Sequence, residues 1–284
     1  MAVNYILISM FCMTIILPFV WLVSSSLLSI EELALRGRFI LFPQKPTMSA
    51  YKQVLSQGSL VFNCYMVTLQ RVMVGTSLNV IFTTALAYGL SKKDMFGRNI
   101  FITLIFITFF FSGGLIPSYL VVVSLGMKNS LWALIIPGLI SAWNMLLVKS
   151  FLNSIEPAME ESAFIDGANE ITIFYKIIIP VSKPIIATIT LYCAVSHWNA
   201  WFDALIYIND AKKLPIQNLL RSVIFASQLS MVGGFGGTEV RTVAPPSSAV
   251  ISSTIVITTV PILCVYPFLQ KYFVKGVMIG SLKG

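Results

Sequence analysis

Charged residues are scarce in this chain. Only 11% of its 284 residues are Asp, Glu, Lys or Arg, while 57% are hydrophobic, and an ordinary globular chain carries roughly 25% charged residues. This balance excludes a soluble domain. Several apolar runs approach the ~20 residues that a helix needs to cross a bilayer.

Motifs for chemistry are also absent. The sequence has no GxxxxGK[ST] phosphate loop, so any ATP hydrolysis has to be supplied by another chain. No acid, base and nucleophile cluster together as a membrane enzyme would require. The cysteines are isolated and lack CxxC spacing, and the sequence has a single histidine. They form no Cys/His cluster, so we interpret them as small hydrophobic residues rather than metal ligands. They are Cys12, Cys64, Cys193 and Cys264. The net charge of +8 suits anionic lipid headgroups, and we expect no nucleic-acid partner.

Six apolar runs have the length of a membrane-spanning helix, and none shows the alternating ten-residue pattern of an outer-membrane barrel. They are Tyr5–Leu28, Asn63–Leu90, Ile100–Val123, Leu131–Leu152, Pro184–Ile208 and Ala249–Leu269. The first is too long for a signal peptide and has no cleavage site after it, so we expect it to remain as a span. The sequence predicts an all-α membrane protein, a single transmembrane domain over residues 1–284.

Six spans place both termini on one side of the membrane, with the loops at 91–99 and 153–183. The basic residues divide equally between the two sides, but Lys92, Lys93 and Arg98 crowd one short loop. Short loops weigh most in the positive-inside rule, which favours that side as cytoplasmic. The outer loops are then 29–62 and 208–248, and a cytoplasmic tail covers 270–284.

The segment Glu161–Pro180 is polar and lies between long apolar runs. Its charges and backbone would go unsolvated in hydrocarbon, so it must be an aqueous loop. Pro157 is suited to a helix start and Gly167 to a turn. Apolar residues then recur from Ile171 to Ile178 with helical spacing. We expect a short helix, a turn and a second helix that returns to the membrane. The alternative is an amphipathic helix that lies on the headgroups.

The same segment resembles the cytoplasmic coupling motif of ABC importer permeases, E-A-A-x3-G-x9-I-x-L-P. The matching positions are Glu161, Ser162, Ala163, Gly167, Ile177, Ile179 and Pro180, with Ser for the first Ala and Ile for the Leu. The tail Val265–Gly284 and the segment His197–Tyr207 are similar to the maltose-type carbohydrate permeases, in the branch that handles oligosaccharides. The resemblance implies a type I ABC importer permease fold, with a coupling helix between the fourth and fifth spans.

The resemblance also implies partners and a location. Two ATPase subunits would bind ATP and Mg, a second related permease chain would complete the pathway, and an extracytoplasmic binding protein would deliver the sugar. This chain would be a non-enzymatic subunit that binds no cofactor or metal, a multi-pass protein of the bacterial cytoplasmic (inner) membrane with cytoplasmic termini. The residues that would contact the ATPase are Glu161, Ser162, Ala163, Asp166, Gly167 and Ala168.

Sugars are recognised by aromatic faces, amides and carboxylates, and such side chains gather in the fifth span. The substrate-path candidates are His197, Trp198, Asn199, Trp201 and Asp203, with Asn144 and Arg71 from earlier spans. The open alternatives are an aromatic belt at the outer surface for the tryptophans and an Asn144 that only joins two helices. Arg71 either snorkels to the outer surface or serves as a counter-ion for Asp203 or for an acidic sugar.

Two questions stay open at this stage. The outer loops are either linkers or the docking surface for a binding protein. The function is either that of an ABC permease or that of an ion-coupled secondary transporter of small polar solutes. Internal repeats and buried carboxylate relays would favour the secondary transporter, but only Asp203 is a plausible buried acid.

Overall fold

The structure is a computed structural model that describes residues 2–36, 40–56, 59–232 and 248–281, and the elements in these ranges are helices. Contacts divide the chain into two compact units. One comprises residues 1–67 and 214–263, and the other comprises residues 68–213 and 264–284. Each unit is described by itself below.

The first unit contains the N-terminal helix and the parts of the chain that we predicted to form the outer loops. Its elements are α1 (Ala2–Ser26), α2 (Ile30–Arg36), α3 (Ser49–Leu55), α13 (Ile216–Val232) and the first part of α14 (Ser248–Ser281). The predicted outer loop at 29–62 is ordered around Glu32, whose carboxylate accepts hydrogen bonds from the Gln44 N–H at 2.9 Å and from Arg36 at 3.0 Å. Glu32 therefore links α2 to the backbone at Gln44.

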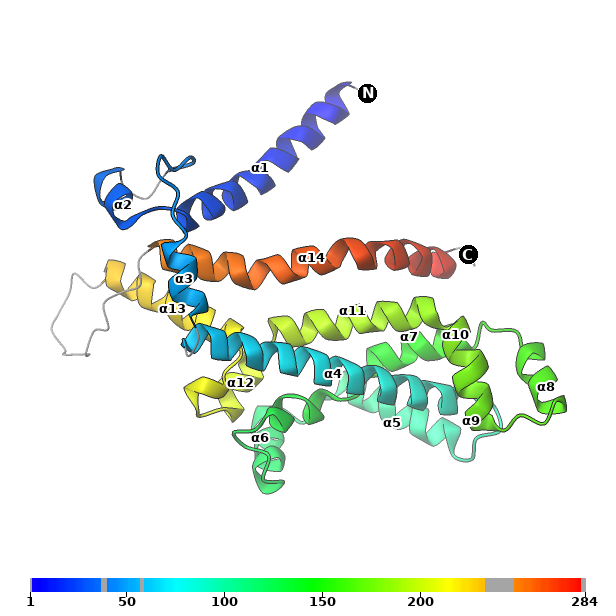
Figure 1. Ribbon diagram of the computed structural model, residues 1–284. Helices are drawn as coiled ribbons and strands as arrows, with labels where there is room; N and C mark the ends of the chain where they lie inside the picture. The colour runs from blue at the N-terminus through cyan, green and yellow to red at the C-terminus, as the bar shows by residue number, and fades with distance from the viewer. Residues whose placement is uncertain (1, 37–39, 57–58, 233–247, 282–284) are drawn as a thin grey trace. The chain divides into compact units, whose positions relative to one another are not determined.

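The second unit continues α4 (Leu60–Ser91), which begins in the first unit, and builds a helical bundle around it. Its other α-helices are α5 (Arg98–Phe110), α6 (Leu115–Ser124), α7 (Ala142–Leu152), α8 (Ala158–Ile165), α9 (Glu170–Ile173), α10 (Ile179–Val181), α11 (Lys183–Asn199) and α12 (Phe202–Tyr207). Short 3-10 turns occupy Leu131–Leu134 (η1), Ile136–Gly138 (η2) and Ala211–Lys213 (η4), and a π turn occupies Phe174–Ile178 (η3). Helices α4, α5, α7 and α11 run side by side, with α8 and α9 at one end and α6 and α12 at the other (Figure 1).

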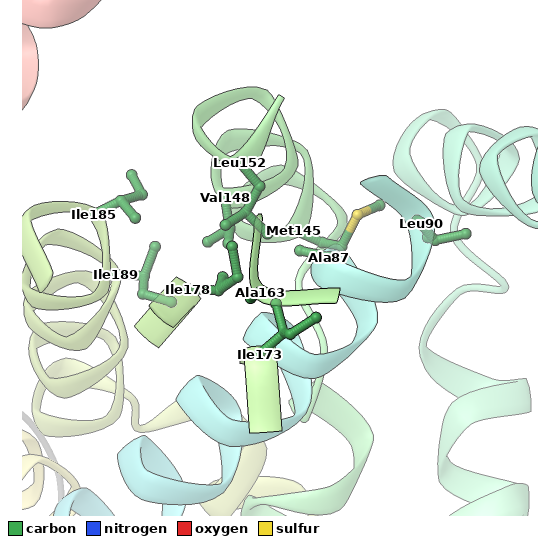
Figure 2. Packing of buried hydrophobic residues seen from close by; sticks show 10 residues of the cluster. All are labelled: Ala87, Leu90, Met145, Val148, Leu152, Ala163, Ile173, Ile178, Ile185 and Ile189. Carbon is green, nitrogen blue, oxygen red and sulfur yellow. The ribbon is translucent and has the colours of Figure 1, made fainter. Parts of the chain in front are cut away.

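An apolar core packs the α8–α9 end of this bundle. Figure 2 shows its side chains converging from α4, α7, α11 and the segment between α7 and α11. The members are Ala87, Leu90, Met145, Val148, Leu152, Ala163, Ile173, Ile178, Ile185 and Ile189. Burial of this apolar surface fixes the segment 158–181 against the helix ends.

Three of the six predicted spans are unbroken helices: the first, the second and the last, which lies within α14. Among the described residues, Val3–Ser26 and Leu60–Ser91 are each long and apolar enough to cross a membrane alone. The third predicted span, Ile100–Val123, is instead two helices, α5 and α6, that meet at 118°. Ser112, Gly113 and Gly114 separate them, and residues with such low helix propensity allow the helix to end there.

The fourth and fifth predicted spans are also interrupted. Residues 131–138 form short 3-10 turns around Pro137 and meet α7 at 50°, because proline cannot donate the hydrogen bond that a continuous helix needs. In the fifth, α11 ends at Asn199, Ala200 is extended and α12 begins at Phe202. Helical spacing along an unbroken fifth span would pair His197 with Trp201 and Asn199 with Asp203, and this break removes both pairings.

The last predicted span is longer than expected. It lies wholly within α14, which continues through most of the predicted tail to Ser281. The Gly-rich and Pro-rich tracts at 233–247 and residues 282–284 lie outside the described residues. The predicted outer loop at 208–248 contains the 17-residue helix α13.

Candidate functional site

A buried ion pair joins α4 to the broken fifth span. The two guanidinium Nη atoms of Arg71 bind the two carboxylate oxygens of Asp203, with Nη1 to Oδ1 at 3.2 Å. The Arg71 side chain is 3% exposed and that of Asp203 is 31% exposed. Arg71 thus lies behind Asp203, which presents its carboxylate outward. Of the two alternatives for Arg71, the geometry matches the counter-ion of Asp203 and not a side chain that snorkels to the outer surface.

His197 joins the same network from α11. The Nε of Arg71 donates to Nδ1 of His197 at 3.4 Å, and His197 Nε2 lies 2.8 Å from the Asn79 amide oxygen. Because the arginine can only donate, Nδ1 must accept, and Nε2 then carries the proton and donates to Asn79. The imidazole is therefore neutral and fixed in one orientation.

Gly75 makes room for this histidine. A Cβ atom at position 75 would lie 2.5 Å from His197 Nε2 and within 3 Å of two ring carbons. No real Cβ tolerates such contacts, so only glycine lets the α4 backbone approach the imidazole this closely. Arg71, Gly75 and Asn79 are spaced at i, i+4 and i+8, so they form one stripe along α4.

The stripe also satisfies the irregular backbone of residues 131–141. Arg71 Nη2 donates to the Leu134 carbonyl at 3.2 Å, and Asn79 Nδ2 donates to the carbonyls of Gly138 and Leu139 at 2.9 Å each. Non-helical backbone at membrane depth is tolerated where protein groups satisfy it or where it lines a wet cavity. Both conditions point to the same place in the second unit.

A cavity of about 640 Å³ opens where the broken fourth and fifth spans meet. Its wall combines carboxylate, guanidinium, amide, hydroxyl and aromatic groups. They include Arg71, Asn79, Ser118, Ser141, Trp143, Asn144, Tyr192, Ser196, His197, Asp203 and Tyr207. Trp143 is 56% exposed and stacks on Phe109 with ring centres 6.3 Å apart, and Tyr192 is 36% exposed. Such a wall can hold a flat, hydroxyl-rich ligand.

The predicted path residues separate into two groups. His197, Asp203, Asn144 and Arg71 line the cavity, whereas Trp198, Asn199 and Trp201 do not. Trp198 is buried in the protein, and Asn199 is exposed away from the cavity wall. Asn144 donates to the Cys193 thiol at 3.5 Å, so it links α7 to α11 as well as lining the cavity.

Sequence reasoning missed several cavity residues: Asn79, Ser118, Ser141, Trp143, Tyr192, Ser196 and Tyr207. Asn79 had an available signal, since it lies two helical turns from Arg71 on the same face of an apolar run. The serines had none, because single hydroxyls are common in membrane helices.

The second candidate site is the turn between α8 and α9, which we call the elbow (158–173). Gly167 has φ +83°, its N–H donates to the Phe164 carbonyl, and the Ala168 N–H donates to the Ala163 carbonyl, each at 3.0 Å. These bonds form a Schellman motif that ends α8. The Asn169 side chain then accepts the Thr172 N–H at 2.8 Å and caps α9. The predicted helix, turn and returning helix are present.

The elbow exposes most of the residues that the coupling motif singled out. Glu161, Ser162, Asp166 and Gly167 are exposed, and Ala168 is half-buried. Ala163 instead faces the chain's own core at 8% exposure, so its small size serves internal packing.

Large apolar side chains are exposed on the elbow as well. Ile165 is 87% exposed and Ile171 is 70% exposed, although our predicted stripe would have buried Ile171. Ile173 is buried in its place, whereas Phe174, Ile177 and Ile178 of the predicted stripe do pack into the core.

Comparisons with known proteins place these sites in context. No protein-family model matches the chain. It is 41% identical over 276 residues to the polygalacturonan/rhamnogalacturonan transport system permease protein YtcP of Bacillus subtilis strain 168, covering 97% of this chain and 95% of that protein. It is 44% identical over 269 residues to Protein LplC of the same organism, covering 95% and 90%.

A solved structure matches the fold. The chain superposes on a chain in the crystal structure of a bacterial ABC transporter involved in the import of the acidic polysaccharide alginate, with a TM-score of 0.83. The two chains are 32% identical, and the match covers 96% of this chain and 95% of that one.

Proposed function

This chain belongs to the permease subunits of ABC carbohydrate importers, and from that premise we propose that its cavity forms part of the sugar path and that its elbow receives the ATPase. It is the transmembrane subunit of an ABC importer, and this family assignment replaces the alternative of an ion-coupled secondary transporter. The steps below concern how this chain carries out its share of transport.

We propose six crossings of the cytoplasmic membrane, arranged as one permease domain. Helices α1, α4 and α14, the bent pair α5–α6, the bent segment 131–152 and the broken pair α11–α12 supply six segments among the described residues. With six crossings both termini lie on the elbow's side. Lys92, Lys93 and Arg98 near that end favour it as cytoplasmic.

The observation that carries the proposed path is the cavity at the meeting point of two broken spans. Broken helices line substrate sites in other membrane transporters, because their free backbone groups need polar surroundings. Asp203 and Asn144 can bind sugar hydroxyls, and Trp143 and Tyr192 can stack on sugar rings. Arg71 offsets the charge of Asp203, so the wall neither traps nor repels an anion strongly. A path must bind weakly enough to release its cargo.

The proposed cargo is an oligosaccharide that carries carboxylates. The support comes from relatives, since one is named for polygalacturonan and rhamnogalacturonan transport and another works in alginate import. All three polymers contain uronic acids. A charge-balanced wall is compatible with moving such chains without holding them.

We propose that the elbow docks into the ATPase through its exposed face. Exposed Ile165 and Ile171 in an aqueous loop indicate a protein partner, because water solvates such side chains poorly. Glu161 and Asp166 on the same segment can pair with basic residues of that partner. The complete importer would contain two ATPase subunits that bind ATP and Mg, a second permease chain and an extracytoplasmic binding protein.

Asp203→Ala in the reconstituted importer tests the path. Removal of the carboxylate takes away a hydroxyl acceptor and leaves Arg71 without its partner, so we expect uptake of labelled oligogalacturonide to fall at least tenfold. The binding protein should still bind sugar and the complex should still assemble. Asn199→Ala, on the same span but away from the cavity, is the matched control and should transport normally.

A cysteine-free background gives a direct measurement of the same idea. Ser196→Cys on the cavity wall should react with a water-soluble thiol reagent, and saturating substrate should slow that reaction. If Ser196→Cys stays unlabelled in every state of the ATPase cycle, or if Asp203→Ala transports at the normal rate, the cavity is not the path.

A further inference from the structure

Charged and aromatic side chains cluster where α4 ends and the elbow begins. Lys92 follows α4 directly and forms an ion pair with Glu160 of α8. The same ammonium lies 3.4 Å from the Glu170 carboxylate, at the start of α9. The Tyr88 hydroxyl of α4 donates to Glu170 at 2.7 Å. One lysine therefore links both arms of the elbow to the end of α4.

Aromatic rings enclose this lysine. Its Nζ lies 4.6 Å from the centre of the Tyr88 ring and 5.9 Å from that of Phe164 on α8. Tyr88 in turn packs on Phe174, with ring centres 4.9 Å apart. These contacts add cation–π attraction and reduce the access of water to the ion pair.

The surroundings keep Lys92 charged. Burial lowers the pKa of Lys92, but the hydrogen bonds to Glu160 and Tyr88 and the charge of Glu160 outweigh it, so the net pKa is above its usual value. The side chains of Lys92 and Glu160 are each only 24% exposed. A pair shielded to this extent is screened less by salt than an open surface pair.

One unbroken helix, α4, connects this cluster with the stripe Arg71, Gly75 and Asn79. Leu60–Ser91 is a continuous 32-residue helix. Arg71 and Lys92 are separated by about 30 Å along it, at ~1.5 Å per residue. A rigid helix with fixed contacts at two places is a physical route for coupling them. Displacement of one end of α4 would thus move Arg71 relative to Asp203.

We propose that Lys92 is a positioning residue that fixes both arms of the elbow to α4, so that movement of the elbow is delivered through α4 to the cavity. This inference rests on the proposed function, in which the ATPase moves the elbow. The apolar core holds the elbow in place. The ion pair determines which helix receives the elbow's movement, because it links the elbow to α4, which carries the stripe Arg71, Gly75 and Asn79.

The test is the ratio of sugar transported to ATP hydrolysed in the complete importer, reconstituted in proteoliposomes. Lys92→Gln should lower this ratio at least fivefold while ATP hydrolysis continues. Lys93→Gln, the exposed neighbour, should leave it unchanged, and Lys92→Arg, which keeps the charge, should retain most of it. Charge reversal by Lys92→Glu should be more severe, and Lys92→Glu with Glu160→Lys should recover part of the loss.

The ratio separates coupling from folding, since a misfolded or unassembled fraction lowers transport and hydrolysis alike. A normal ratio in Lys92→Gln, or equal losses in both rates, would overturn the role of Lys92. If Lys92→Gln does not assemble, Glu160→Gln removes the same ion pair from the α8 side and is judged by the same ratio.

Failure of the proposed function gives a different result. Ser162→Cys on the exposed elbow should cross-link to the ATPase subunit. Absence of that cross-link in an active importer would remove the elbow's proposed partner. A cross-link that forms while Lys92→Gln couples normally would remove only the role of Lys92.

Discussion

At the scale of single residues, the stripe Arg71, Gly75 and Asn79 accounts for most of the site's geometry. Arg71 holds Asp203 and one backbone carbonyl, Asn79 holds His197 and two more, and Gly75 leaves space for the imidazole. A buried arginine that loses its partner costs several kcal/mol, more than an exposed pair would return. The three residues therefore act together and resist separate substitution.

Gly75→Ala should disrupt this site. The new methyl would push His197 off Asn79, at an expected cost of about 1–3 kcal/mol for overpacking and a lost hydrogen bond. We expect a lower midpoint of thermal unfolding in detergent and slower uptake.

Gly89→Ala is the matched control on the same helix, since a Cβ at position 89 meets no atom within 4 Å. It should be neutral or slightly stabilising, because alanine favours the helix by up to about 1 kcal/mol over glycine. Equal unfolding midpoints for the two variants would contradict the close approach of Gly75 to His197.

The sequence singled out Arg71, Asp203 and His197 but could not decide how they interact. Helical spacing predicts contacts along one helix, and these contacts run between helices separated by up to 132 residues. The sequence around the break after Asn199 also contains no glycine or proline that would predict it. The partners were thus found only in three dimensions.

At the scale of elements, the elbow is a helix end, a left-handed glycine and a capped helix start. Gly167→Trp should uncouple the importer because it strains a φ of +83° and adds bulk to the exposed face that we propose for the ATPase. We expect ATP hydrolysis without sugar stimulation and at least a tenfold loss of uptake, with normal membrane insertion.

Gly126→Trp controls for backbone strain alone. Gly126 has φ +67° and open space around it, in the loop after α6, at the end of the bundle opposite the elbow (Figure 1). This variant should retain sugar-stimulated hydrolysis. Normal stimulation in a well-expressed Gly167→Trp importer would argue against docking at the elbow.

The elements themselves were predictable where hydropathy and turn chemistry agree. The spans α1 and α4, and the elbow with its glycine turn, match the sequence pattern closely. Hydropathy averages over about twenty residues, so it cannot see a break inside an apolar run. The bends at residues 111–114 and 135–141 had local glycine or proline signals that such averaging conceals.

At the scale of the whole molecule, this chain should be inactive without a second, non-identical permease. The six crossings that we propose leave little room to enclose an oligosaccharide, and the cavity of about 640 Å³ is open rather than sealed. Purified with the ATPase alone in proteoliposomes, the chain should show no sugar-dependent ATP turnover. Addition of the partner permease and binding protein should restore it. A homodimer that transports sugar would refute this expectation.

The Arg71–Asp203 pair also has a consequence for membrane insertion, because its two partners are synthesised at different times. Arg71 leaves the ribosome 132 residues before Asp203, which at about 5–20 residues per second is a delay of roughly 7–26 seconds. During that interval a cationic side chain has entered the bilayer with no carboxylate to neutralise it, an expensive arrangement in lipid. The nascent chain must therefore shelter α4, inside the insertion machinery or against water, until the fifth span arrives to close the pair.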